Sequence, residues 1–288
     1  MASSVQPAPE TWIAAFNRAA DRVRDRLSEV TADADRLAET GTTGEGGDRT
    51  LVIDAEAEDL IFAELDALHE QGARFTALSE ERGTVDYGSP DVLLVIDPID
   101  GSMNAKRGMP HHAVSIAVAE GPAVATTGTM ADVVCGLVAD LGPDERWTAI
   151  RGAGAWLDGA PIVAAAEERL TSAGKLELVA IESAHPAHVM ASGEALLEHV
   201  HRLRAVGAIA ISLCAVAGGR CDGMASLWRC RAVDAAAGQL IVRESGGHVA
   251  FGDLDAPLDS PLDLVAHGPV VAARSAAGLA RVAQLPHG

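Results

Sequence analysis

Residues 93–102 have the sequence LLVIDPIDGS, an apolar run that ends in two aspartates three positions apart. Residues 92–96 are apolar and rich in β-branched side chains, which predicts a strand buried on both faces. We expect this strand to end at Asp97 and Pro98, so that Asp97 and Asp100 lie at its end. A buried strand that ends in carboxylates is an arrangement typical of a binding or catalytic site.

Two carboxylates as near in sequence as Asp97 and Asp100 repel each other unless a cation lies between them. Mg²⁺ prefers hard oxygen ligands, usually one or two carboxylates together with phosphate and water. Pro98 stiffens the turn, and Gly101 allows the backbone to approach a ligand closely. The ordinary structural alternative is an Asp-Pro turn, in which Asp and Gly are common turn formers. This run alone leaves both interpretations open.

The composition indicates a globular protein and restricts its partners. The chain has 288 residues, of which 48% are hydrophobic and 22% charged. Its formal net charge of -19 argues against nucleic acid or a membrane surface held by a general basic face. An anionic substrate would need a local reversal of charge, which a metal bound to clustered carboxylates provides.

No targeting or disulfide pattern is evident. The four cysteines lack CxxC spacing, so reduced thiols are expected. The N-terminus has no basic segment followed by an apolar run, and the uncharged stretch 205–219 is too short to span a bilayer comfortably. We therefore expect a cytoplasmic protein.

The remaining periodicity alternates between helix and strand. The glycine-rich residues 41–47 predict a loop, and the turn-rich residues 151–162 predict a border between an N-terminal half, 1–150, and a C-terminal half, 151–288. Expected helices cover 12–30, 55–69, 208–217 and 234–245; expected strands cover 51–53, 176–181 and the runs AVSIAVA, AVATTG and VVCGLVA within 113–138. This alternation is typical of an α/β or α+β fold.

Other carboxylates stand where a site could recruit them. Glu80 and Glu81 precede the buried strand, and Asp54 and Asp234 each stand at the expected start of a helix. Taken singly, Glu80 and Glu81 are explained as a solvated charge cluster. Asp54 and Asp234 are explained as helix N-caps.

The combined pattern resembles the inositol monophosphatase-like phosphatases, which are related to fructose-1,6-bisphosphatases. Four motifs in the expected order carry this resemblance: SEE at 79–81, DPIDGSMN at 97–104, GAGAWLDG at 152–159 and VDAAAGQLIVRESGG at 233–247. The resemblance implies a layered αβαβα sandwich, with an active site between the two halves. It also implies a homodimer.

The resemblance assigns roles to individual residues. It implies that two or three Mg²⁺ ions are bound by Glu80, Asp97, the carbonyl of Ile99, Asp100 and Asp234. Gly101 and Ser102 would offer backbone N–H groups to the phosphate. Asp54, with the Ser102 hydroxyl, would orient the attacking water. Metal-assisted in-line displacement follows, without a covalent enzyme intermediate.

The substrate is less well defined by the motifs. Inositol-specific relatives carry a glutamate where this chain offers Ser226 and Leu227. Arginine suits bidentate phosphate contacts, so a second phosphate pocket is one interpretation of the basic residues, and solvated surface charge is the other. The candidates for substrate contacts are Lys106, Arg107, Gly207, Ala208, Arg229 and Arg231.

We therefore expect a phosphoric monoester hydrolase acting on inositol monophosphate or a similar polyol or sugar phosphate. Fructose 1,6-bisphosphate is the first alternative, followed by 3′-phosphoadenosine 5′-phosphate and histidinol phosphate. A catalytically weak regulatory or binding relative is the alternative from another class. A zinc site at His111 and His112 is disfavoured, because the other expected ligands are oxygen atoms.

Overall fold

The computed structural model describes residues 6–29, 39–43, 45, 49–163 and 167–287. Strand β1 (Glu39–Thr43) pairs antiparallel with β2 (Arg49–Leu51). The loop expected over 41–47 was therefore wrong for residues 41–43, while Gly44, Gly46 and Gly47 lie outside the described residues. The strand expected over 51–53 was also wrong beyond Leu51, because helix α3 (Val52–Glu70) begins there.

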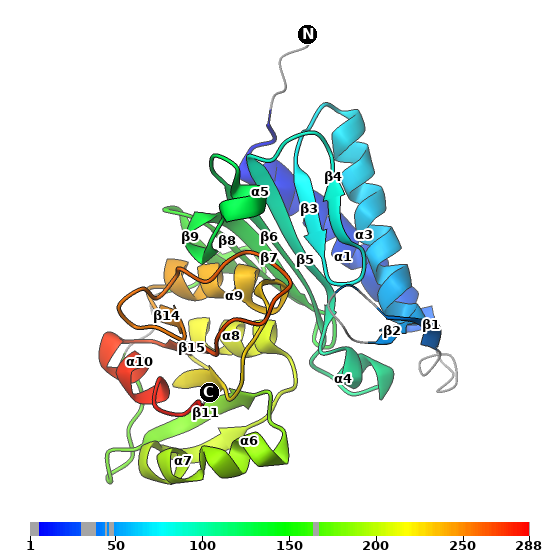
Figure 1. Ribbon diagram of the computed structural model, residues 1–288. Coiled ribbons are helices and arrows are strands. Elements are labelled where there is room, and N and C mark those ends of the chain that lie inside the picture. The colour runs from blue at the N-terminus through cyan, green and yellow to red at the C-terminus, as the bar shows by residue number, and fades with distance from the viewer. Residues whose placement is uncertain (1–5, 30–38, 44, 46–48, 164–166, 288) are drawn as a thin grey trace.

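A large, mainly antiparallel sheet forms the upper body of the molecule (Figure 1). Its strands are β3 (Thr76–Ser79), β4 (Gly83–Asp86), β5 (Val92–Asp100), β6 (Ala113–Glu120), β7 (Val133–Asp140), β8 (Glu145–Ile150), β9 (Gly154–Leu157) and β10 (Ala160–Pro161). Their spatial order is β10-β9-β8-β7-β6-β5-β3-β4. The sheet thus continues past residue 150, and the division of the chain between 150 and 151 stays a prediction.

A smaller mixed sheet follows in the second half of the chain. Its strands are β11 (Leu176–Glu182), β12 (Val200–Arg204), β13 (Gly223–Ser226), β14 (His248–Phe251) and β15 (Val270–Ala273), in the order β12-β11-β13-β15-β14. The strands β11, β12 and β13 are parallel. Their carboxyl ends therefore meet at one edge, which is where ligands bind in open α/β sheets.

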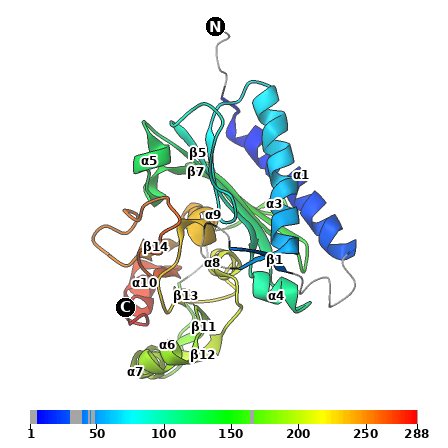
Figure 2. The ribbon, with the colours of Figure 1, turned by 45° about the vertical axis from the view of Figure 1, so that its right-hand side comes forward.

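The helices complete five layers. Helices α1 (Pro9–Glu29) and α3 cover the outer face of the large sheet, while α8 (Ile209–Ala217) and α9 (Ala232–Glu244) lie between the two sheets (Figure 2). The outer face of the small sheet carries α6 (Pro186–Ala191), α7 (Gly193–His199) and α10 (Ala276–Val282). The predicted αβαβα sandwich is confirmed. Among the described residues, no helix combines the length and apolar character needed to cross a membrane.

Two local predictions were wrong. The run AVATTG contains the short helix α5 (Val124–Thr127) rather than a strand. The hydroxyls of Thr126 and Thr127 donate to the carbonyl of Ala123 at 3.0 and 3.2 Å, so local hydrogen bonds favour a helical turn there. Strand β5 also does not end at Asp97 but continues through Asp100, with an irregular register against β6 between these residues.

Small side chains allow α9 to lie close to the large sheet. Ala235, Ala236, Ala237 and Gly238 are buried, and a Cβ added at Gly136 of β7 would lie 3.1 Å from the Cα of Ala237. This close approach places the start of α9, with Asp234 in its first turn, against the face of the large sheet that is turned toward the small sheet.

Gly136→Val should therefore destabilise the protein by roughly 1–3 kcal/mol, because the added methyl groups have no room against α9. The matched control is Gly193→Val, since a Cβ at Gly193 meets nothing within 4 Å and the expected change is below about 0.5 kcal/mol. Urea unfolding of both variants measures the difference. Equal stabilities of the two variants would show that a larger side chain at position 136 can be accommodated against α9.

Candidate active site

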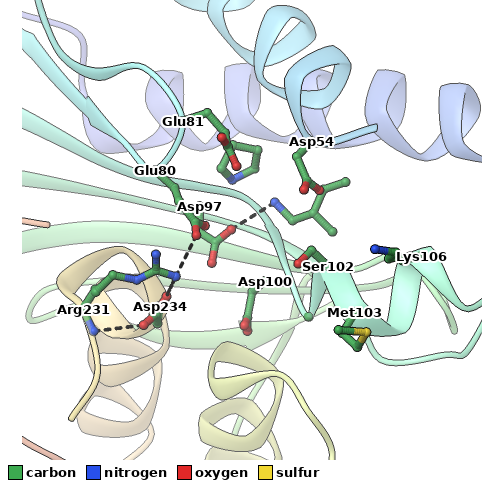
Figure 3. Close-up of a pocket in the computed structure, with 13 residues that line it drawn as sticks. Asp54, Glu80, Glu81, Asp97, Asp100, Ser102, Met103, Lys106, Arg231 and Asp234 are labelled. Carbon is green, nitrogen blue, oxygen red and sulfur yellow. Dashed lines mark hydrogen bonds and ion pairs between the residues drawn. The ribbon is translucent and has the colours of Figure 1, made fainter. Parts of the chain in front are cut away.

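A cavity of about 430 Å³ opens where β5 ends and α9 begins (Figure 3). It is lined by Asp54, Glu80, Glu81, Asp97, Pro98, Ile99, Asp100, Gly101, Ser102, Met103, Lys106, Arg231 and Asp234. Every residue that the resemblance implicates in metal, phosphate or water binding lies on this wall. The metal, phosphate and catalytic roles themselves stay predictions.

Four segments far apart in the sequence supply the polar side chains: α3, the turn after β3, residues 97–106 and the start of α9. Asp54 lies in the first turn of α3, Glu80 directly follows β3, and Asp97 and Asp100 lie in the last four residues of β5. Ser102 begins the short helix α4 (Ser102–Lys106). Figure 3 shows these side chains directed toward a common space.

The predicted substrate contacts divide into two groups. Lys106 and Arg231 line this cavity, and Gly207 and Ala208 line a neighbouring cavity of about 440 Å³ that shares Asp100, Arg231 and Asp234 with it. Arg107 and Arg229 are exposed and line neither cavity. His111 and His112 also lie outside both linings.

Burial and like charge dominate the electrostatics of the aspartates. The pKa of Asp97 is raised well above its ordinary value by burial and then by the charge of Glu80. Burial and then the charge of Asp234 raise the pKa of Asp100. Asp97 accepts the N–H of Ile99 at 3.0 Å, which fixes its side chain at the turn.

Backbone donors at the start of α8 hold the second aspartate in place. The carboxylate of Asp100 accepts the N–H of Ile209 at 3.3 Å and that of Ala210 at 2.7 Å. Negative charge is favourable at a helix N-terminus, and these amides partly offset the burial of the carboxylate. The aspartate thus joins the large sheet to the helix layer between the sheets.

Arg231 lies among the carboxylates rather than facing the solvent. Its Nη2 lies 2.7 Å from Oε1 of Glu80 and 3.2 Å from Oδ1 of Asp234. Its backbone N–H donates to Oδ2 of Asp234 at 2.9 Å. Burial raises the pKa of Glu80 to about 7, although Arg231 works in the opposite direction.

The donor chemistry of this wall fits a divalent cation that prefers oxygen. Glu80, Asp97, Asp100 and Asp234 bring only carboxylate oxygens to the wall. Burial raises the pKa values of Glu80, Asp97 and Asp100, and a bound cation would favour their charged forms. Among the described residues, no three His, Cys, Asp or Glu side chains already converge closely enough to hold a metal ion.

Gly101 can only be glycine at this position. Its φ is +83°, and a Cβ there would lie 2.8 Å from the carbonyl oxygen of His111 and 3.1 Å from that of Gly207. Both contacts are with backbone, which cannot rotate away. The tight turn after Asp100 therefore depends on this residue.

Two polar residues of the neighbouring cavity were not foreseen from the sequence. Buried Glu182 accepts the hydroxyl of Ser212 at 2.5 Å and the N–H groups of Val206 and Gly207 at 3.2 and 2.9 Å. Asn104 donates to the carbonyls of Val206 and His111, both at 2.8 Å. The signal for Glu182 was available, because it ends the apolar run of residues 178–181 as Asp97 ends that of residues 92–96.

Comparisons with known proteins agree with this architecture. The model of the inositol monophosphatase family matches residues 8–285. A fructose-1,6-bisphosphatase/inositol-1-monophosphatase of Methanothermobacter thermautotrophicus is 31% identical over 91% of each chain. An inositol-1-monophosphatase of Mesorhizobium japonicum is 32% identical over 78% of each chain. The crystal structure of extragenic suppressor protein suhB from Bartonella henselae superposes with a TM-score of 0.75 at 25% identity, covering 96% of this chain and 99% of that one.

Stability should depend on the protonation of Glu182. Burial, partly offset by the Ser212 and backbone donors, raises its pKa to about 7. A pKa that is higher in the folded state contributes stability that is complete below the unfolded-state value and is lost as pH rises through about 7. Denaturant unfolding in EDTA should show wild type losing up to about 3 kcal/mol relative to Glu182→Gln between pH 5 and pH 8. Parallel pH profiles would contradict this assignment.

Proposed function

Because this chain belongs to the inositol monophosphatase family, we propose that it is a Mg²⁺-dependent phosphatase that hydrolyses inositol monophosphate or a similar polyol or sugar phosphate. The observation that carries this proposal is the gathering of Glu80, Asp97, Asp100 and Asp234 around one cavity. These carboxylates come from separate segments, and a folded protein rarely collects buried like charges without a use for them. A homodimer in the cytoplasm is part of the same proposal.

The residues of the wall have distinct parts in this reaction. The side chains of Glu80, Asp97, Asp100 and Asp234, with the carbonyl of Ile99, would hold Mg²⁺. Bound Mg²⁺ supplies the charge that activates water and stabilises the phosphoryl and leaving oxygens. Ser102 and Asp54 would orient the attacking water, and the N–H groups of Gly101 and Ser102 would position the phosphate.

Phosphate release from a substrate panel tests this proposal. The panel contains inositol 1-phosphate, fructose 1,6-bisphosphate, histidinol phosphate and 3′-phosphoadenosine 5′-phosphate, each with Mg²⁺ or EDTA. Activity should require Mg²⁺ and fall by about a hundredfold or more in Asp97→Asn, because that variant loses a charge at the reacting centre. Thermal unfolding of the variant checks that it folds. Full activity in EDTA would contradict the metal mechanism.

A bisphosphate is the second candidate substrate. The Methanothermobacter relative is named for both activities, and Lys106 lies on the cavity wall. Ser226 and Leu227 also stand where inositol-specific relatives carry a glutamate. These features favour a site that binds a second phosphate group of the substrate rather than the hydroxyl groups of an inositol ring.

Lys106→Ala should raise KM for fructose 1,6-bisphosphate by about tenfold or more, the scale of one charge-assisted phosphate contact. Its KM for inositol 1-phosphate should change less. Arg107→Ala is the matched control, because Arg107 is exposed and lies outside the lining. Steady-state kinetics of the three proteins on both substrates decide the point, and equal effects of Lys106→Ala on both substrates would exclude a second phosphate contact.

The same experiments also test two further alternatives. Preference for 3′-phosphoadenosine 5′-phosphate or histidinol phosphate in the panel would assign a different substrate. The name of the Bartonella relative describes a suppressor rather than a reaction, so a regulatory role is the alternative from another class. Metal binding without release of phosphate from any panel member would favour that role.

A further inference from the structure

Arg231 lies in the cavity lining and makes ion pairs with two of its acidic residues. Its guanidinium joins Glu80, which follows β3, to Asp234 of α9, at 2.7 and 3.2 Å (Figure 3). The side chains of all three residues are largely shielded from solvent, with exposed fractions of 18%, 15% and 12%. An ion pair in such a setting is screened far less than one on the surface.

Arg231 contacts one carboxylate oxygen of each of the two acidic residues. Oδ2 of Asp234 is held by the backbone N–H of Arg231 at 2.9 Å, so Oδ1 is the oxygen that faces the guanidinium. Oε1 of Glu80 faces the same nitrogen, Nη2. One guanidinium nitrogen thus bridges two carboxylates that the proposed function assigns to metal binding.

We propose that Arg231 is a resident cation of this site, which competes with Mg²⁺ for Glu80 and Asp234 and must leave them when the metal binds. This inference rests on the proposed metal-dependent function. Burial opposes the charge of Arg231, but Asp234 and Glu80 more than compensate and raise its pKa, which keeps the guanidinium charged. The residue therefore balances the carboxylates before metal binding and lowers the apparent affinity for Mg²⁺.

Competition by Arg231 predicts the direction in which its removal changes the affinity for Mg²⁺. Mg²⁺ binding to wild type must break two ion pairs and leave a positive side chain near the new cation. In Arg231→Gln neither cost exists, while the backbone N–H to Asp234 is kept. The variant should therefore bind Mg²⁺ more tightly, although its metal-free form should be less stable because its carboxylates are no longer balanced.

Calorimetric titration of EDTA-treated protein with Mg²⁺ tests the proposal. We expect Arg231→Gln to bind Mg²⁺ about tenfold more tightly than wild type. Arg231→Lys, which keeps the charge but loses the planar fork, should fall between them and serves if the Gln variant folds poorly. Arg220→Gln is the matched control: Arg220 makes a 2.6 Å ion pair with Glu145 away from both cavity linings, so its loss should leave Mg²⁺ affinity unchanged.

Thermal unfolding supplies an independent readout. In EDTA, Arg231→Gln should melt below wild type, and saturating Mg²⁺ should remove most of that difference. Equal or weaker Mg²⁺ binding by Arg231→Gln would overturn the inference, as would equal tightening in Arg220→Gln. If neither wild type nor variant bound Mg²⁺, both this inference and the metal mechanism would fail. Mg²⁺ binding without phosphate release would reject only the catalytic proposal.

Discussion

Mutual repulsion among buried carboxylates is the constraint on which the rest of the site depends. Asp97 and Asp100 are almost fully shielded from solvent, and Glu80 and Asp234 add like charge to the same cavity. Each of these charges loses hydration on folding, so each needs a donor or a cation nearby. The segments that meet here are therefore arranged to supply donors as well as to pack.

Backbone amides donate to several of these carboxylates, and the same hydrogen bonds connect the layers of the fold. Asp100 of the large sheet binds the N-terminus of α8, and Glu182 of the small sheet binds the loop directly before that helix. Asn104 binds the same loop from the side of the large sheet, through the carbonyl of Val206. The loop before α8 is thus held from both sheets, so the geometry of the cavity depends on how the two sheets are joined.

Local sequence patterns predicted the helices and strands whose apolar residues recur with a regular spacing. Residues 92–96 and the start of α9 could be recognised because apolar runs and helical spacing are visible in a short window. The helix α5 was missed because AVATTG has strand-like composition, and side-chain hydrogen bonds to Ala123 decide its conformation. The metal ligands were proposed from motifs that resemble a family, and their placement around one cavity required the tertiary structure.

The position of Arg231 could not be predicted, because an arginine in sequence does not reveal which charge it faces. Its local neighbour Asp234 is three residues away, but Glu80 comes from another layer of the fold and is brought near only by the packing of α9 on the large sheet. Ser226 and Leu227, which stand where the family resemblance implies a substrate-contacting glutamate, lie five and four residues before Arg231. Under the proposed function, residues 226–234 would therefore carry both the charge that balances the carboxylates and a contact to the leaving group. A substitution there that changes substrate preference would then also alter the binding of Mg²⁺.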